Sequence, residues 1–454
     1  MKIRSQNMTE GPLGRQILRF SIPLMISNVL QVLFHMSDIA VVGRFAGPVA
    51  LGAVGSTATL VTLFTGFFMG FGNGVNVLTA RCFGAKRQED LRQTVHTSAL
   101  ICLLFGVILL AAGLLFGADL LELLNTKAEL IEGAALYLRV YFWGMPAVAL
   151  YNFGSGVLSA VGDTKRPLYI LLGAGVLNVV LNLLFVIGFR MDVAGVALAS
   201  VVSQYLSATL IILALFRGRE AYNLRWRAMT VNGRKAAMLL RLGLPCGLQY
   251  AIFAIANLFI QVGVNTFDAT TVSGNSAAAN ADGLVYDMMA AFCTACSSFI
   301  GQNYGAGKRE RILKSYFISV AYSFGVGALL GLGLVLFGRQ FLGLFTTEPA
   351  VIDAGMKRLT VMGCSYAVSA FMDVTIAASR GLGKSVVPTI FVIVGCCVLR
   401  IVWVYTVFAW WPTMTVLYAV YILSWVLTSV AEILYFTKCY RAVCAGLTAE
   451  RRLP

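Results

Sequence analysis

The sequence contains twelve long apolar runs, and these constrain its fold more than any other feature. A helix that crosses a lipid bilayer needs roughly 20 predominantly apolar residues. We expect membrane helices over 17–43, 51–79, 94–117, 133–159, 168–189, 194–216, 237–266, 275–302, 315–337, 354–379, 388–410 and 414–437. Transmembrane β-strands would alternate polar and apolar residues, which these runs do not. The pattern predicts an all-α polytopic membrane protein.

The composition excludes the water-soluble alternatives. Of the 454 residues, 59% are hydrophobic and 12% charged, whereas an average soluble domain carries roughly a quarter charged residues. The ten cysteines do not form a disulfide framework. Cys293 and Cys296 have the C-x-x-C spacing, but the sequence has no second C-x-x-C pair and no histidine near them. We therefore expect these cysteines to pack between helices, and we expect no metal and no cofactor. Residues 1–14 are polar, so we expect no cleavable signal peptide.

The basic residues predict the orientation in the membrane. Of the 35 lysines and arginines, 27 lie in the terminal segments, in the connections after even-numbered runs, or within the first five residues of the runs that follow them. Since cytoplasmic loops carry an excess of basic residues, we expect both termini to be cytoplasmic in a multi-pass cell-membrane protein. The net charge of +15 then suits anionic headgroups on that side. Nucleic acid is not an expected partner, because no basic surface with interleaved aromatic residues collects in one place.

The chain also repeats itself. The segments LRFSIPL at Pro23, RCFGAKRQEDL at 81–91 and SAVGDTKRP at 159–167 correspond to LRLGLPC at Pro245, QNYGAGKRERI at 302–312 and SRGLGKSVVP at 379–388. We expect an N-terminal lobe over 1–216, a cytoplasmic linker over 217–235 and a C-terminal lobe over 236–454. An even number of helices in each repeat gives both lobes the same orientation, related by a pseudo-two-fold along the membrane normal with a cavity between them.

A succession of motifs resembles one transporter family. MTEGPLGRQILRFSIPLMISNVLQ, SDIAVVGRFAGPVALGAVG, ARCFGAKR, AVGDTKRP, LNVVLNLLF and GQNYGAGKRERI are similar, in this order, to the multidrug and toxic compound extrusion (MATE) family. The resemblance covers nearly the whole chain. It implies twelve helices in two six-helix repeats, V-shaped around a central cavity. It also implies alternating access and the export of organic, often cationic compounds in exchange for H⁺ or Na⁺, by a monomer.

Polar residues inside the first apolar run define a candidate site. Asn28, Gln31, His35 and Asp38 are spaced three, four and three residues apart, so they share one helix face. A polar stripe on a membrane helix should face protein or a water-filled cavity, and Gln31 and His35 are candidates to line a substrate cavity. Desolvation favours the neutral form of a carboxyl group, so Asp38 would take up and release a proton. For His35, a helix-packing role stays open.

The resemblance adds partners for Asp38. The proton-coupled branch of the family implies that the ion-coupling residues are Asp38, Asn152, Asn178, Asn182 and Ser200. The departure is Asn182, where that branch has Asp, so one proton carrier is lost. Sodium also stays open, because amide oxygens and one carboxylate suit a hard cation. A network of amides and hydroxyls that only joins helices is the alternative for the asparagines and serines.

The second repeat has its own buried charges. We expect Arg400 to pair with Asp287 or Asp373, because an unpaired buried cation is costly. The sodium-coupled branch of the family has acids in helices seven and ten. The seventh run contains none, which disfavours a sodium site there, although Asp373 can match the acid of helix ten. Met288, Met289 and Phe292 either line a cavity for flat lipophilic ligands or pack as core. Glu432 is expected to reach toward the interface.

These observations favour a secondary antiporter over an enzyme. No P-loop or hydrolase motif occurs, and the loops are too short for a nucleotide-binding domain. A cationic substrate and a coupling cation would stabilise the same buried negative charge, so they can exchange. The alternative within transport is a flippase or exporter of a lipid-linked saccharide or other endogenous metabolite. It would need several basic groups facing a pyrophosphate, where the sequence offers Arg400 and Arg139. An intramembrane enzyme or receptor is poorly supported, since His35 and His96 are the only histidines.

Overall fold

The computed structural model describes residues 7–124, 126–218 and 220–450, with side chains described as far as residue 446. In that part of the chain every regular element is helical. The elements are α1 (Leu13–Phe45), α2 (Gly47–Gly84), α3 (Gln88–Leu123), α4 (Ala128–Phe142), α5 (Met145–Ala160), α6 (Lys165–Leu183), the π-helix η1 (Leu184–Gly188), α7 (Asp192–Phe216), the short 3₁₀-helix η2 (Trp226–Ala228), α8 (Gly233–Val264), α9 (Ala269–Gly305), α10 (Arg309–Leu342), α11 (Pro349–Gly381), α12 (Val386–Val392), the π-helix η3 (Ile393–Val398), α13 (Leu399–Tyr405), α14 (Val407–Trp410) and α15 (Met414–Glu450).

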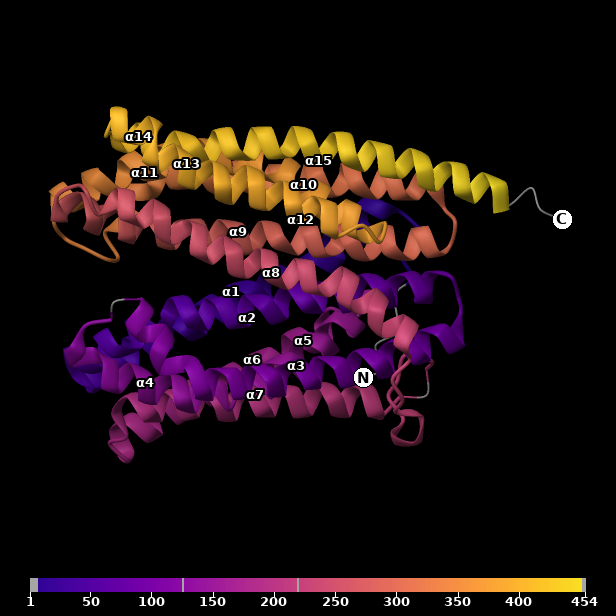
Figure 1. Ribbon diagram of the computed structural model, residues 1–454, viewed down its shortest axis with the longest axis horizontal. Helices are drawn as coiled ribbons and strands as arrows, with labels where there is room; N and C mark the ends of the chain where they lie inside the picture. The colour runs from indigo at the N-terminus through magenta and orange to yellow at the C-terminus, as the bar shows by residue number, and fades with distance from the viewer. Residues whose placement is uncertain (1–6, 125, 219, 451–454) are drawn as a thin grey trace. The chain divides into compact units, whose positions relative to one another are not determined.

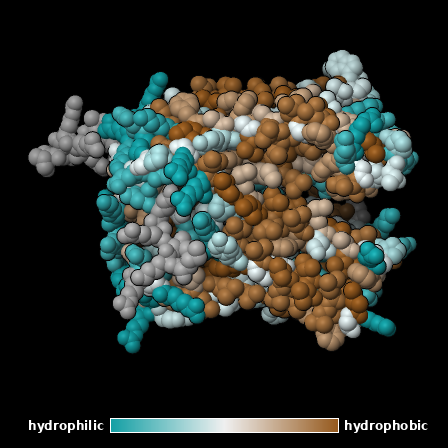
Figure 2. Space-filling model, turned by 180° about the vertical axis from the view of Figure 1, so that it is seen from behind, coloured by the Kyte–Doolittle hydropathy of each residue, from teal (hydrophilic) through white to brown (hydrophobic). Residues whose placement is uncertain are grey.

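The helices have the length and surface of membrane spans. Eleven of those described are long and apolar enough to cross a bilayer. Large apolar side chains such as Leu115, Leu329 and Leu336 are exposed on them. Figure 2 shows mostly brown, hydrophobic side chains over the middle of the face that it draws, with teal, hydrophilic side chains toward its two ends. Such a surface is stable only in a solvent as apolar as itself, so the prediction of an all-α polytopic membrane protein is confirmed.

One predicted helix is wrong in its continuity. The run 133–159 forms two helices, α4 and α5, with a turn at Trp143–Gly144. In that turn the amides of Trp143 and Gly144 donate to carbonyls three residues back. Pro146 stands in the first turn of α5, where its missing N–H is tolerated but would interrupt a continuous helix. The break between α4 and α5 therefore follows from Pro146.

The contacts divide the chain into two compact units. One contains Ile26–Ala251, and the other contains Asn7–Met25 together with the chain from Ile252 onward. In the first, α2, α3, α5 and α7 pack along one another, and in the second α9, α10, α11 and α15 do so (Figure 1). The boundaries fall inside α1 and α8, shortly after Pro23 and Pro245. The predicted lobes 1–216 and 236–454 stay a prediction, to which the contacts add that α1 and α8 each belong to both units.

A buried ion pair joins α9 and α11 in the second unit. Arg358 donates to Asp282 and, at 2.7 Å, to Asn275 Oδ1. Tyr366 donates its hydroxyl proton to the same carboxylate, and Tyr418 of α15 donates to Asn275 at 2.9 Å. The guanidinium of Arg358 also lies 5.3 Å from the centre of the Tyr418 ring. Because both charges are enclosed and hydrogen-bonded, removing either one leaves the other buried and uncompensated.

We expect Asp282→Asn to lower the free energy of unfolding by about 3–5 kcal/mol, because Arg358 would lose its counter-charge in a buried place. The exposed pair between Arg339 and Asp353, 2.6 Å apart, is the matched control, and Asp353→Asn should cost at most about 1 kcal/mol. Thermal denaturation in detergent measures both variants. Equal losses of stability in the two variants would show that burial does not determine how much an ion pair contributes to the free energy of unfolding.

Glycines let α10 and α11 touch through their backbones. A Cβ atom on Gly331 would lie 2.0 Å from the carbonyl oxygen of Gly363, and one on Gly363 would lie 2.7 Å from that of Gly331. Gly333, on the same helix, has open space at its Cβ position. Small residues allow such close approach of membrane helices, where packing replaces the hydrophobic effect as the driving force.

Gly331→Ala should therefore destabilise the second unit by about 1–3 kcal/mol, since α10 and α11 must separate. Gly333→Ala should be neutral or slightly stabilising, because alanine is the better helix former. The midpoint of thermal unfolding in detergent distinguishes the two. A pair of variants with the same midpoint would contradict the close packing.

Candidate ion-coupling site

A carboxylate on α1 is buried among polar side chains of α6 and α7. Asp38 is 8% exposed. Its Oδ1 accepts a hydrogen bond from Asn182 Nδ2 at 2.5 Å, and its Oδ2 accepts one from Ser200 Oγ at 3.2 Å. Both oxygens of the carboxylate thus receive a donor, which is the arrangement that a negative charge requires inside a membrane.

Asn178 closes this set into a ring of four side chains. Its Oδ1 accepts from Asn182 Nδ2 at 3.3 Å, and its Nδ2 donates to Ser200 Oγ at 3.3 Å. We call Asp38, Asn178, Asn182 and Ser200 the Asp38 ring. The structure brings together four of the five residues that the resemblance implied for ion coupling. Their role in coupling stays a prediction.

The local fold explains why α6 presents two asparagines to the ring. Asn178 and Asn182 are one helical turn apart on one face of α6, and the π-helix η1 begins directly after Leu183. Arg166, in the first turn of α6, forms an ion pair of 2.8 Å with Asp163, which lies just before the helix. Burial raises the pKa of Asp163, and its bonds with Arg166 act against that rise. This turn fixes the start of α6 and so the direction of its polar face.

Two tyrosines of α4 lie near the ring. Tyr137 and Tyr141 are buried, and their rings stack with centres 5.7 Å apart. Both interact electrostatically with the carboxylate of Asp38. Neither tyrosine was expected at this site from the sequence. Their spacing of four residues in a membrane helix was a usable signal, but an aromatic pair at that spacing is usually core.

The other predicted residues of this half lie elsewhere. Asn152 donates to the carbonyl of Val148 in its own helix at 2.9 Å and makes no described bond with the ring. Gln31 and His35 have exposed side chains on α1. They share a helix face with Asp38 in the sequence, but they do not bond to its carboxylate among the described residues. Their place in a substrate cavity stays a prediction.

In the second unit, the expected ion pair of Arg400 is wrong. The described ion pairs include none between Arg400 and Asp287 or Asp373. Arg400 instead donates to Ser424 and Asn257 at 3.4 Å, and its guanidinium lies 4.4 Å from the centre of the Tyr421 ring and 5.0 Å from that of Phe253. Two aromatic faces and two polar oxygens stabilise the cation without a contacting carboxylate. Asp373 is near enough to feel its charge.

The candidate ligand-binding residues of α9 are mostly core. Met289 and Phe292 are each 1% exposed and pack in apolar clusters of the second unit. Met288 is half-buried. The packing interpretation therefore describes Met289 and Phe292 in this structure, while Met288 has surface to offer a ligand.

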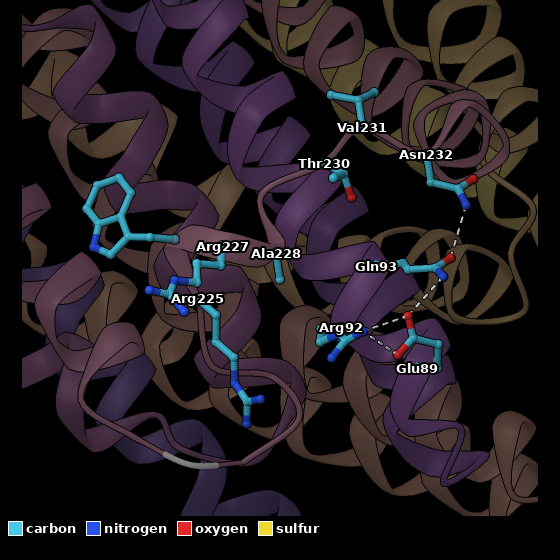
Figure 3. Close-up of a pocket in the computed structure, with 10 residues that line it drawn as sticks. Glu89, Arg92, Gln93, Arg225, Arg227, Ala228, Thr230, Val231 and Asn232 are labelled. Carbon is cyan, nitrogen blue, oxygen red and sulfur yellow. Dashed lines mark hydrogen bonds and ion pairs between the residues drawn. The ribbon is translucent and has the colours of Figure 1, made fainter.

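A surface cavity of about 860 Å³ lies beside the linker, between the first turns of α3 and residues 225–232. Figure 3 shows Asn232, Gln93, Glu89 and Arg92 joined by hydrogen bonds along its wall. The linker is also held by His96, whose Nε2 accepts from the amide of Arg225 at 2.9 Å. The cavity is lined by both polar and apolar side chains and is distinct from the Asp38 ring. Its lining is that of a loop docked on a helix end.

Comparisons with known proteins agree with this architecture. A family model described as MatE matches residues 23–184 and 245–406, one segment in each half. The chain is 30% identical to the probable multidrug resistance protein YpnP of Bacillus subtilis over 80% of this chain and 81% of that protein. It is 27% identical to the probable multidrug resistance protein YoeA of the same organism over 85% of each.

Solved structures show the same fold. An outward-facing multidrug resistance MATE family transporter of the MOP superfamily aligns with a TM-score of 0.91 at 23% identity, over 98% of this chain and 99% of that one. A MATE structure in a bent conformation aligns with a TM-score of 0.89. The paired family matches and the shared helical architecture show that this chain belongs to the MatE family of membrane transporters.

Proposed function

We propose that this protein is a secondary multidrug efflux antiporter, which exports lipophilic or cationic small molecules in exchange for H⁺, or for Na⁺, by alternating access. It would act as a monomer in the cell membrane with both termini cytoplasmic and anionic headgroups against its basic loops. Two curated relatives named as multidrug resistance proteins support the substrate class. The Asp38 ring carries the proposal, because it holds one exchangeable charge in a buried, fully hydrogen-bonded setting.

The ring has the chemistry of a two-state proton site. Both carboxylate oxygens of Asp38 accept hydrogen bonds, which fits the ionised form of the acid. Asn182 Oδ1 is a buried acceptor with no donor among the described residues. If Asp38 takes a proton, its new O–H needs an acceptor. A half-turn of the Asn182 amide supplies one, since an amide carries donor and acceptor on nearly isosteric arms. Protonation and amide orientation are then linked.

This chemistry gives a role to the departure at position 182. A second carboxylate there would repel Asp38, and the pair would share one proton until a cation arrived. An asparagine accommodates both states of Asp38 without adding a charge. One carboxylate then serves the coupling ion and a cationic substrate in turn, because each neutralises it.

The alternative transport function has less support. A carrier of lipid-linked pyrophosphates or similar metabolites needs basic groups open to the substrate. Of the two basic groups on which that interpretation depended, Arg400 is 1% exposed and enclosed by aromatic rings. That leaves Arg139, exposed on α4, as the one open to a substrate.

Asp38→Asn should abolish gradient-driven export, because it removes the exchangeable charge but keeps the shape of the ring. Transport in proteoliposomes with separately imposed pH and Na⁺ gradients tests this and identifies the coupling ion. Asp353→Asn, an exposed acid on α11, is the matched control and should transport like the parent. Undiminished export by Asp38→Asn would remove Asp38 from the mechanism.

Asn182→Asp should retain export and shift its pH dependence, since two carboxylates within hydrogen-bonding distance titrate as a coupled pair. The rate of pH-gradient-driven export, measured across pH in the parent and the variant, shows the shift. Superimposable pH profiles would contradict a direct link between position 182 and the proton.

A further inference from the structure

A second carboxylate is buried in the second unit, on α15. Glu432 is 0% exposed, and neither of its carboxylate oxygens has a hydrogen-bond partner among the described residues. The expectation that it reaches toward the interface is wrong, because the side chain is enclosed by its neighbours. A buried polar group without a partner is rare in folded proteins and calls for an explanation.

Glu432 ends a polar row on one face of α15. Ser424, Thr428 and Glu432 follow one another at intervals of four residues, so they lie one turn apart on the same face. Ser424 accepts from Arg400 at 3.4 Å, and Thr428 contacts the thiol of Cys396 at 3.5 Å. The row thus faces η3 and α13 near its start and reaches Glu432 two turns later.

The charges that face this row come from α11 and α13. Arg380, in the last turn of α11, is the charged group that acts on Glu432. Asp373, two turns earlier on α11, feels both Arg380 and Arg400. Two acids and two arginines therefore line the contact of α15 with its neighbours.

Glu432 differs from the fixed acid of the same unit. Asp282 receives hydrogen bonds from both Arg358 and Tyr366, which hold its charge in one place. Glu432 lies near an arginine but without a contacting donor. Burial favours the neutral acid and the charge of Arg380 favours the carboxylate, so the two influences oppose each other. A group that gains and loses a proton needs its neutral and charged forms to be stabilised to a similar extent. In a structural ion pair, the contacting partner stabilises the charged form alone.

We propose that Glu432 is a second proton-binding group of the transporter, in its C-terminal half, which takes up and releases a proton during the transport cycle. This proposal rests on the proposed antiport function. The proposed ligand is a proton, because the positive charge of Arg380 acts on Glu432 and disfavours a metal cation beside it. On uptake, the proton adds to one carboxylate oxygen of Glu432, and on release it returns to water.

Infrared difference spectroscopy of the purified full-length protein tests this directly, by comparing high and low pH in H₂O and D₂O. We expect a protonated-carboxyl band that titrates, shifts in D₂O, is lost in Glu432→Gln and remains in Asp38→Asn. Glu432→Asp should restore a titrating band, which separates loss of the carboxyl group from misfolding. Ser429→Ala, one turn away on α15, is the control and should keep the band.

Transport assays give the second readout. Glu432→Gln should lower the number of protons moved per substrate while substrate binding is retained. A spectrum that Glu432→Gln leaves unchanged, or a band that never titrates, overturns the proposal. Failure of the parent to couple export to a pH gradient would instead overturn the proposed function, and the spectrum would still report whether Glu432 exchanges a proton.

Discussion

A carboxylate at membrane depth must receive hydrogen bonds from its neighbours, and the arrangement of the first unit follows from that requirement. Asp38 cannot turn to lipid, so α1 must meet the polar faces of α6 and α7. The donors are side chains of asparagine and serine, which carry no net charge. These donors therefore leave the negative charge of Asp38 uncompensated, as the proposed exchange with a cation requires, whereas a lysine or arginine in the same place would neutralise it.

The two halves of the sequence repeat do not repeat this chemistry. The matched segments begin at residues 23 and 245, so Ile260 occupies the position that corresponds to Asp38. Arg400 falls within one residue of the position that corresponds to Asn178. An apolar residue has replaced the acid, and a fixed cation stands near the place of an amide. Among the described residues, the second unit thus keeps the helices of the repeat without a carboxylate at the position of Asp38, and its acids include Asp282, Asp373 and Glu432 on α9, α11 and α15.

The sequence was most informative where a polar residue interrupts an apolar run. Asp38 was found because a carboxylate is costly in a membrane unless it has a partner. Asn178, Asn182 and Ser200 were implied as its partners by the family resemblance. Reasoning from the cost of a charge missed Arg358 and Asp282, which lie near the ends of their runs, where a charge can be explained by the interface. It misplaced the partner of Arg400, since cation–π contacts with Tyr421 and Phe253 depend on helix rotation. Spacing also could not show that Asn152 bonds within its own helix.

The central claim is that one carboxyl group binds the coupling ion and the substrate in turn. Proton release on substrate addition tests it most directly, measured with a pH-sensitive dye in weakly buffered detergent solution. The parent should release protons when a cationic substrate binds, and Asp38→Asn should release fewer while remaining folded. Equal proton release by the two proteins would contradict exchange at Asp38 and leave only the architecture of the family.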